Sequence, residues 1–282
     1  MKIAISSEST IDLPKEVLER YDIRTVPFDI LLGDENFTDG EKTNEEIFAT
    51  VDATGILPKT TAVNDYRYTE HFESLLKEYD AIIHIGISSG ISSAVTNATR
   101  VALGMKNVYV IDSLSLTTGI ALLAIYARTL TQTISDPKVI VEKVTERLGS
   151  LQVSFIVERL DYLFKGGRCS SLALLGANLL KIRPSIIVQK DGKMVSYKKY
   201  RGKMPMCVEK YVLETLSDFP TPDLSLAFIT YSTASDEMIN SAYECLKNAG
   251  FKEIIQTRTG ATVSSHCGAN TLGVIYFNDG NK

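Results

Sequence analysis

The sequence has few of the residues that bind metals or carry redox chemistry. It contains four cysteines and three histidines among 282 residues. No cysteine stands at the short spacing to another that metal and redox sites use, so we expect free thiols. No cluster of acidic residues accompanies the histidines, so we expect no metal site and no cofactor.

Long apolar runs and strong positive charge are absent as well. No run approaches the roughly 18 to 20 uncharged residues that span a bilayer, and the N-terminus lacks the apolar core of a signal peptide. The net charge is −4 and no long basic segment favours a nucleic-acid partner. With 44% apolar residues, we expect a cytoplasmic globular protein of one large or two ordinary domains without an integral membrane segment.

The first half of the chain alternates short apolar runs with helical patterns. The runs at residues 2–7, 81–87 and 107–112 each precede a helical stretch. The first of these helices is expected to begin at Ser9 or Thr10. This alternation predicts an α/β domain over residues 1–150, with a doubly wound, mostly parallel sheet.

The second half has a different pattern. Residues 185–200 are expected to form a β-hairpin that turns at Asp191-Gly192. Three more strands are expected around one clear helix, namely at residues 224–232, 252–260 and 271–279 with the helix at 235–250. The pattern predicts an α+β domain over residues 151–282 with a mainly antiparallel sheet.

Several loops after the predicted strands are rich in hydroxyl groups. They are residues 6–10, 88–93 and 112–119, and residues 59–64 directly precede a further helix. Ligands bind at the carboxyl ends of strands in open α/β sheets, and helix N-termini attract anions. A helix cap needs one hydroxyl, whereas residues 88–93 supply four serines, so Ser92 or Ser93 is expected to combine capping with binding of an anion.

The sequence has neither the glycine spacing of dinucleotide-binding loops nor that of P-loops. Of the histidines, His71 lies in a polar helical pattern and is expected at the surface. His84 lies in an apolar strand and is expected to be a hydrogen-bonded core residue. His266 lies in a predicted loop among serines and glycines, where a structural and a functional role are equally open.

Two apolar stretches with helical character, residues 116–130 and 170–188, stand out. We expect them to pack the sheets and the domain interface. Part of that surface is also suited to line a slot between the domains, as a long acyl chain would require.

Residues 160–168, LDYLFKGGR, have the form Leu-x-x-Leu-x-x-Gly-Gly-Arg, and a small-and-apolar stretch follows up to residue 186. Together with the loops at 58–64, 87–95, 110–119 and 264–274, this motif resembles the DegV family over essentially the whole chain. Members of that family are bacterial fatty-acid-binding proteins that act as the lipid-carrying subunit of fatty acid kinase.

The resemblance implies a fatty-acid carboxylate held by several side chains and an acyl chain in an apolar tunnel between the domains. The implied head-group residues are Thr60 or Thr61, Ser92 or Ser93, His266 and Arg168. It also implies a separate, dihydroxyacetone-kinase-like subunit that phosphorylates the carboxylate, so that this protein would perform no chemistry itself. A basic cluster is the expected docking patch for that subunit, or else a solvated hairpin: Lys198, Lys199, Arg201 and Lys203.

The sequence departs from the family pattern beside the expected head-group residues. Ser93-Ala94-Val95, Thr61-Ala62-Val63 and Ala269-Asn270 replace the usual neighbours, which leaves the preferred chain length open. Two alternatives to a fatty-acid carrier remain. One is a hydrolase that uses Cys267 or a loop serine with His266 as base, and the other is a binding module for a small anion such as a phosphorylated metabolite.

Overall fold

The structure is a computed structural model that describes residues 1–169 and 182–280. Its N-terminal half is built on a four-stranded parallel sheet with the order β2-β1-β6-β7. The strands are β1 (Ile3–Glu8), β2 (Ile23–Val26), β6 (Ala81–Gly86) and β7 (Val108–Asp112). Every residue of β1 and β6 is buried, which explains why these strands have continuous apolar runs rather than alternation.

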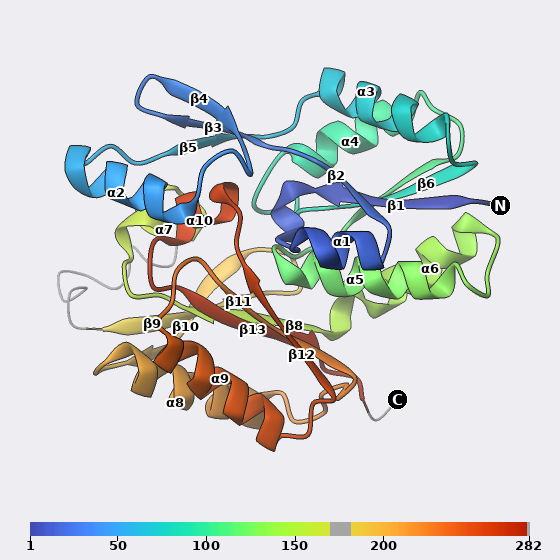
Figure 1. Cartoon of the computed structure of the whole chain (residues 1–282). Helices are drawn as coiled ribbons and strands as arrows, with labels where there is room; N and C mark the ends of the chain where they lie inside the picture. Colours follow the sequence, from blue (N-terminus) through green and yellow to red (C-terminus); the bar gives the residue numbers. More distant parts are fainter. Residues whose placement is uncertain (170–181, 281–282) are drawn as a thin grey trace.

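Helices cover both faces of the parallel sheet (Figure 1). One face packs against α3 (Asp65–Leu76) and α4 (Ala94–Ala102), and the other against α5 (Thr118–Leu130) and α6 (Pro137–Arg147). The predicted doubly wound α/β architecture is therefore confirmed.

The first helix begins later than expected. Ser9–Ile11 form a short 3-10 helix, and Asp12 then has a φ of 53°, in the left-handed region. The helix α1 (Lys15–Arg20) starts only after Pro14, because a proline disfavours helical geometry in the residue before it. Asp12 is thereby a buried turn residue and not part of a helix.

A small antiparallel sheet with the order β4-β3-β5 extends the N-terminal half. It consists of β3 (Asp29–Leu32), β4 (Glu35–Thr38) and β5 (Lys59–Thr61), with α2 (Asn44–Thr54) between the last two. Thr43 and Glu46 cap α2 reciprocally. The apolar side of this lobe packs against Tyr162 and Ala261, so it connects the two halves of the molecule.

The C-terminal half contains a six-stranded sheet with the order β10-β9-β8-β13-β11-β12, in which only β11 and β12 are parallel neighbours. The strands are β8 (Leu151–Ile156), β9 (Arg183–Val188), β10 (Met194–Tyr200), β11 (Leu226–Tyr231), β12 (Glu253–Arg258) and β13 (Leu272–Phe277). The predicted mainly antiparallel sheet is confirmed.

Two helices cover one face of this sheet, α8 (Met204–Asp218) and α9 (Asp236–Asn248) (Figure 1). The sequence pattern predicted α9 but not α8. Two shorter helices, α7 (Asp161–Lys165) and α10 (Ala261–Cys267), lie between the sheets and the small lobe. The boundary near residue 150 stays a prediction; the strands of the parallel sheet end by residue 112, and those of the six-stranded sheet begin at 151.

Helix α5 lies between the two large sheets and packs on β1, β6, β8 and β13. This position explains why α5 is apolar on all sides and confirms that residues 116–130 pack the sheets. Of the other apolar stretch, residues 170–181 lie outside the described residues, and Arg183–Val188 is strand β9. Within the described ranges, no helix is long and apolar enough to cross a membrane.

Candidate functional site

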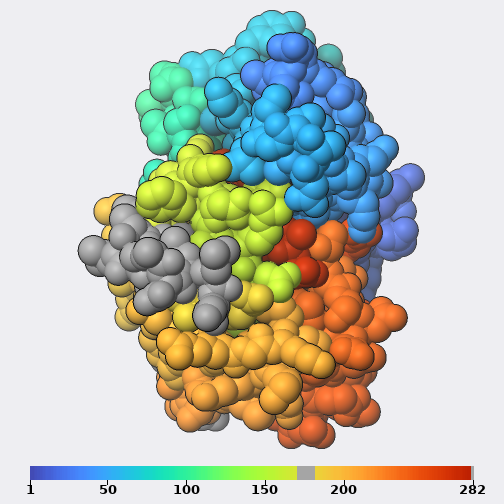
Figure 2. All heavy atoms as spheres, turned by 90° about the vertical axis from the view of Figure 1, so that its left-hand side faces the viewer, coloured from blue at the N-terminus to red at the C-terminus, as the bar shows by residue number. Residues whose placement is uncertain are grey.

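A pocket of about 560 Å³ lies where the small lobe, the parallel sheet and α10 meet. All six residues that were expected to hold a carboxylate line it: Thr60, Thr61, Ser92, Ser93, Arg168 and His266. In Figure 2, the blue N-terminal lobe borders the yellow-green segment that precedes residue 170, and red C-terminal atoms are visible next to both. The structure thus brings together side chains from four separate parts of the chain.

Thr60 and Thr61 are placed by strand pairing. Both belong to β5, where they pair with Ile30 and Asp29 of β3. The loop after β5 is held by α4, because the side-chain amide of Asn97 donates to the carbonyl oxygen of Val63 at 2.8 Å. The threonine strand and the helix behind the serine loop are therefore fixed to each other.

Ser92 and Ser93 lie directly before α4. The hydroxyl oxygen of Ser92 accepts a hydrogen bond from the backbone N–H of Ala94 at 3.2 Å, whereas Ser93 occupies the cap position without a side-chain cap bond. Ser92 therefore makes the capping contact expected of this pair. Accepting that bond leaves its O–H free to donate to a ligand.

His266 lies on a helix, and the prediction of a loop there was wrong. Two acidic side chains from the N-terminal half satisfy the first amides of α10. Asp12 accepts from the N–H of Gly260 at 2.7 Å, and Asp39 accepts from the N–H of Ala261 at 2.6 Å. Both side chains supply acceptors for N–H groups that have no partner within the helix, and they come from more than 200 residues away in the chain.

Only one of the two ring nitrogens of His266 has a hydrogen-bond partner among the described residues. Its Nε2 lies 2.8 Å from Oγ1 of Thr60, and its buried Nδ1 has no partner among the described residues. Burial, and then the nearby Arg168, lower the pKa of His266 to about 4, so the ring is neutral at neutral pH. With its proton on Nε2, His266 donates to Thr60 and leaves the threonine hydroxyl hydrogen for a ligand.

The Gly166-Gly167 pair allows Arg168 to reach the pocket. A Cβ on Gly166 would lie 2.7 Å from Nδ1 of His266 and 2.8 Å from the carbonyl oxygen of Tyr162, and Gly167 has a φ of 69°. Only glycine fits both requirements without strain. Arg168 then donates to the carbonyl oxygen of Gly166 at 2.6 Å.

Arg168 is a half-buried cation that has no ionic partner among the described residues. No acidic side chain of the described residues forms an ion pair with it, and burial lowers its pKa. A buried charge is stabilised when an opposite charge joins it. The pocket therefore favours an anion.

A smaller apolar cavity of about 60 Å³ continues from the pocket. The two share five residues, Ile87, Ile91, Arg168, Thr262 and His266. The cavity then runs between the two large sheets, where its apolar walls are Leu116, Val153, Phe155, Leu163, Met194 and Ile275. The polar pocket is thus the mouth of an apolar slot.

The other two histidines are held in one buried group. The prediction that His71 lies at the surface was wrong, since its Nε2 is 2.8 Å from Oγ of Ser6, and burial lowers its pKa to about 4. His84 is a hydrogen-bonded core residue, as expected, with Ser6 at 3.0 Å and Glu8 at 3.2 Å. Glu8 was not predicted as part of this group, because the segment that contains it, residues 6–10, was predicted to be a hydroxyl-rich loop.

The basic cluster lies away from the pocket. Lys198 forms ion pairs with Glu214 and Asp218, while Lys199, Arg201 and Lys203 are exposed. The near end of the same hairpin touches the serine loop, because Ser88 donates to the carbonyl oxygen of Gly192 at 2.9 Å. At about 3.3 Å per strand residue, the cluster is roughly 20 Å or more from that contact.

The segment Gly86 to Gly90, GISSG, has the nucleophile-elbow spacing of many hydrolases. Its central Ser88 is buried and donates to Gly192, so it has no histidine as base. Cys267 is no better suited, because burial raises its pKa to about 12. The described residues also hold no cluster of metal-binding side chains.

Comparison with known proteins gives a consistent result. A family model described as "Uncharacterised protein, DegV family" matches residues 2–279. A protein of Thermotoga maritima named fatty acid-binding protein is 27% identical, over 97% of this chain and 96% of its own.

Two solved structures have the same fold. A DegV family protein from Thermus thermophilus, described by its fatty acid binding, superposes with a TM-score of 0.90 at 23% identity, over 98% of this chain and 99% of its own. DegV from Bacillus subtilis, described as a fatty acid binding protein, has a TM-score of 0.85 at 25% identity with the same coverage. With its family model matching almost from end to end, this chain belongs to the DegV family.

Proposed function

We propose that this protein binds a long-chain fatty acid and presents its carboxylate to a separate, dihydroxyacetone-kinase-like fatty acid kinase in the cytoplasm. The observation that carries the proposal is the convergence of four hydroxyl side chains, one neutral imidazole and one arginine, which has no acidic partner in the described part of the chain, at the mouth of an apolar slot. The names of the relatives from Thermotoga maritima and Bacillus subtilis support the same ligand class.

The head group would be held by several donors at once. A carboxylate that leaves water needs hydrogen bonds to replace its hydration, and bonds to a charged acceptor are stronger than neutral ones. Thr60, oriented by His266, and Ser92, oriented by the N–H of Ala94, are the donors with defined partners. Arg168 would supply the compensating charge.

The acyl chain would extend between the two large sheets. A water molecule occupies roughly 10 to 15 Å³ on the measure used for such cavities, so about 60 Å³ is less than a long chain requires. We therefore expect the ligand to displace side chains of the wall. Met194, an unbranched residue with three rotatable bonds, is suited to such movement.

Presentation to a kinase requires that the carboxylate stay accessible. Thr61 and Ser93 are exposed side chains of the pocket, so a phosphoryl donor held by a partner would have a route to the head group. The predicted docking patch is reduced to Lys199, Arg201 and Lys203, because Lys198 is occupied by Glu214 and Asp218.

A hydrolase that uses Thr60 and His266 is the main alternative, since the two side chains lie 2.8 Å apart. A nucleophile and base of this kind are normally completed by a group that orients the base. Nδ1 of His266 has no such partner in the described part of the chain, which favours binding over catalysis. Ester turnover that is lost in His266→Ala would favour the hydrolase instead.

The decisive experiment is a lipid analysis of the purified protein. The protein is produced in a bacterial host, denatured and extracted, and the extract is quantified by mass spectrometry. We expect about one long-chain fatty acid per chain. A reproducible lack of fatty acid, with a thermal shift by small phosphorylated metabolites instead, would favour a small-anion module.

A further inference from the structure

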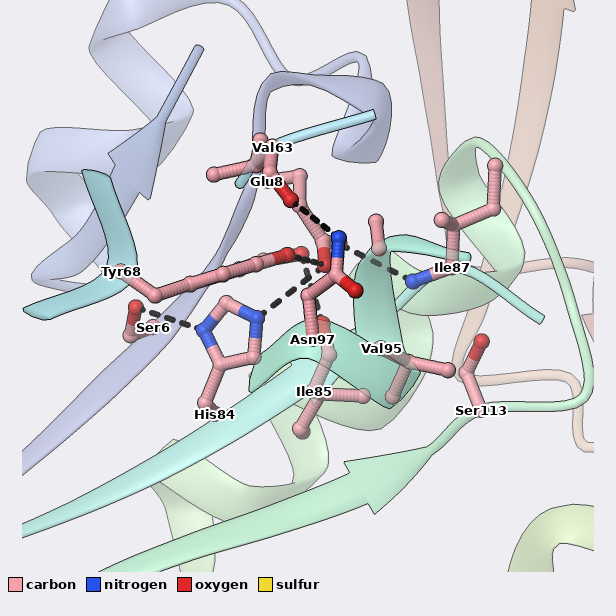
Figure 3. Close-up of polar contacts among 12 residues, drawn as sticks. Ser6, Glu8, Val63, Tyr68, His84, Ile85, Ile87, Val95, Asn97 and Ser113 are labelled. Atoms are coloured by element: carbon pink, nitrogen blue, oxygen red, sulfur yellow. Dashed lines mark hydrogen bonds and ion pairs between the residues drawn. The ribbon is translucent and has the colours of Figure 1, made fainter. Parts of the chain in front are cut away.

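Glu8 is a buried carboxylic acid that the binding site described above does not use. It is the last residue of β1 and is 0% exposed. Figure 3 shows its contacts. Oε1 accepts the O–H of Tyr68 at 2.6 Å and lies 3.2 Å from Nε2 of His84, while Oε2 accepts the backbone N–H of Ile87 at 2.9 Å.

The contact with Ile87 connects Glu8 to the pocket. Ile87 is the first residue after β6, and it lines both the polar pocket and the apolar cavity. The preceding residue also lies close to this carboxylate, because a Cβ on Gly86 would lie 2.9 Å from Oε1 of Glu8. Glu8 therefore contacts the chain at the last residue of β6 and at the first residue after it.

We propose that Glu8 is a positioning residue of the ligand site. Its carboxylate holds the Ile87 amide and so fixes the start of the loop 88–93, which carries Ser92 and Ser93 into the pocket. This inference rests on the proposed function, since it assigns Glu8 a part in fatty-acid affinity.

On the side away from Ile87, a chain of hydrogen bonds through His84 and Ser6 to His71 holds the carboxylate of Glu8 in place. Nδ1 of His84 lies 3.0 Å from Oγ of Ser6, which in turn lies 2.8 Å from Nε2 of His71 on α3. The Ser6 hydroxyl can donate to either ring and accept from the other, so the chain of bonds is complete whether His84 is neutral or charged. Glu8 is thus tied to β6 and α3 as well as to the loop.

The ionised form of Glu8 is the one that this arrangement favours. Burial raises its pKa, but His84 and the donors from Tyr68 and Ile87 outweigh burial, so that the pKa lies below its usual value. The two carboxylate oxygens of Glu8 accept from donors on two sides, Tyr68 and His84 on one and the N–H of Ile87 on the other. A glutamine has only one oxygen, so its N–H₂ group would face the donors on one of the two sides. Replacement by glutamine should therefore loosen the Ile87 contact while it keeps the side-chain volume.

The test compares Glu8→Gln with Ser7→Ala. The Ser7 hydroxyl donates to the carbonyl oxygen of Ile85 at 2.7 Å, so the control removes a buried bond between the same two strands that does not reach Ile87. After lipid removal, oleate affinity is measured by calorimetry and the exchange of the Ile87 amide by NMR. We expect Glu8→Gln to weaken binding by about tenfold and to accelerate Ile87 exchange, and Ser7→Ala to change binding less than about twofold.

Equal oleate affinity in Glu8→Gln and the wild-type protein would overturn the inference. If Glu8→Gln does not fold, hydrogen exchange of the Ile87 amide in the wild-type protein is the test. Exchange as fast as that of an exposed loop amide would also overturn the inference. Tyr68→Phe removes only one donor to Glu8, and we expect a smaller loss of affinity from it than from Glu8→Gln. If the wild-type protein binds no fatty acid, the proposed function fails, while protection of Ile87 would still establish the contact with Glu8.

Discussion

Two serine-rich segments that were predicted as loops lie at the carboxyl ends of neighbouring strands of the parallel sheet, and they behave differently. The second, residues 88–93, does follow β6 as predicted, whereas in the first, residues 6–10, the prediction was wrong, because residues 6–8 end β1 and residues 9–10 begin the 3-10 helix. In the first segment, the hydroxyls bond within the protein, Ser7 to Ile85 and Ser9 to Asp39. In the second segment, Ser92 and Ser93 line the pocket.

The difference comes from what surrounds each segment at the edge of the sheet. The first segment lies in an interior that has its own acceptors and donors, among them Asp39 and the imidazole of His84. The second faces the small lobe and α10 across an open space. A high content of hydroxyl groups at the edge of a sheet thus indicates a ligand site only where the protein itself leaves those groups unsatisfied.

The largest expected effect comes from removing two donors of the pocket. In Ser92→Ala with Thr61→Ala, a carboxylate would lose bonds worth about 1.5 to 3 kcal/mol each. We expect retention of fatty acid through purification to fall from near one per chain to almost none, as measured by mass spectrometry.

Ser7→Ala is the matched change in the first segment, residues 6–10. It removes a buried hydrogen bond and should lower the free energy of unfolding by about 1 kcal/mol, as measured in urea, with full retention of fatty acid. Similar retention in the double variant and in Ser7→Ala would mean that the two segments do not differ in function.

A smaller loss is expected from Arg168→Met. The change removes the half-buried cation of the pocket but keeps much of its apolar stem. We expect affinity for a fluorescent fatty acid to fall about tenfold, with the free energy of unfolding unchanged or slightly higher, because an unpaired charge no longer has to be buried.

Arg159→Met is the control for Arg168→Met. Arg159 lies just before α7 and forms ion pairs with Asp52 and Asp161 outside the pocket. Its loss should lower the free energy of unfolding modestly and leave ligand affinity unchanged. Weaker binding in Arg159→Met than in Arg168→Met would show that the position of α7, and not the charge of Arg168, governs affinity.

The sequence was sufficient to predict the two large sheets in outline, but not strand β8 or the small sheet β4-β3-β5. The residues around the pocket came from the resemblance to the DegV family. Continuous apolar runs identified the buried strands β1 and β6, and the DegV-like motif pointed to Arg168. It could not predict α10, because the acceptors that hold its N-terminus, Asp12 and Asp39, are distant in the chain. A seven-residue helix has little stability without such contacts.

Glu8 and His71 were missed for a related reason. A glutamate within SSEST and a histidine within a polar helical pattern both read as exposed residues. Their burial follows from the pairing of β1 with β6 and the packing of α3 on β6, which bring Ser6, His71 and His84 together. Local pattern carries no information about such contacts between distant segments.

The last prediction separates the two regions by pH. His71 contacts the first segment and His266 lines the pocket, and the pKa of each is lowered from 6.5 to about 4. Each ring takes up a proton on unfolding, so the free energy of unfolding should decrease as the pH falls from about 6.5 to about 4 and be fully retained above that window.

A bound carboxylate favours the charged form of a neighbouring imidazole. Fatty acid should therefore raise the pKa of His266 and leave that of His71 unchanged, as followed by NMR titration of the ring protons. Equal shifts of both rings would mean that the ligand acts on the whole sheet edge and not on the pocket alone.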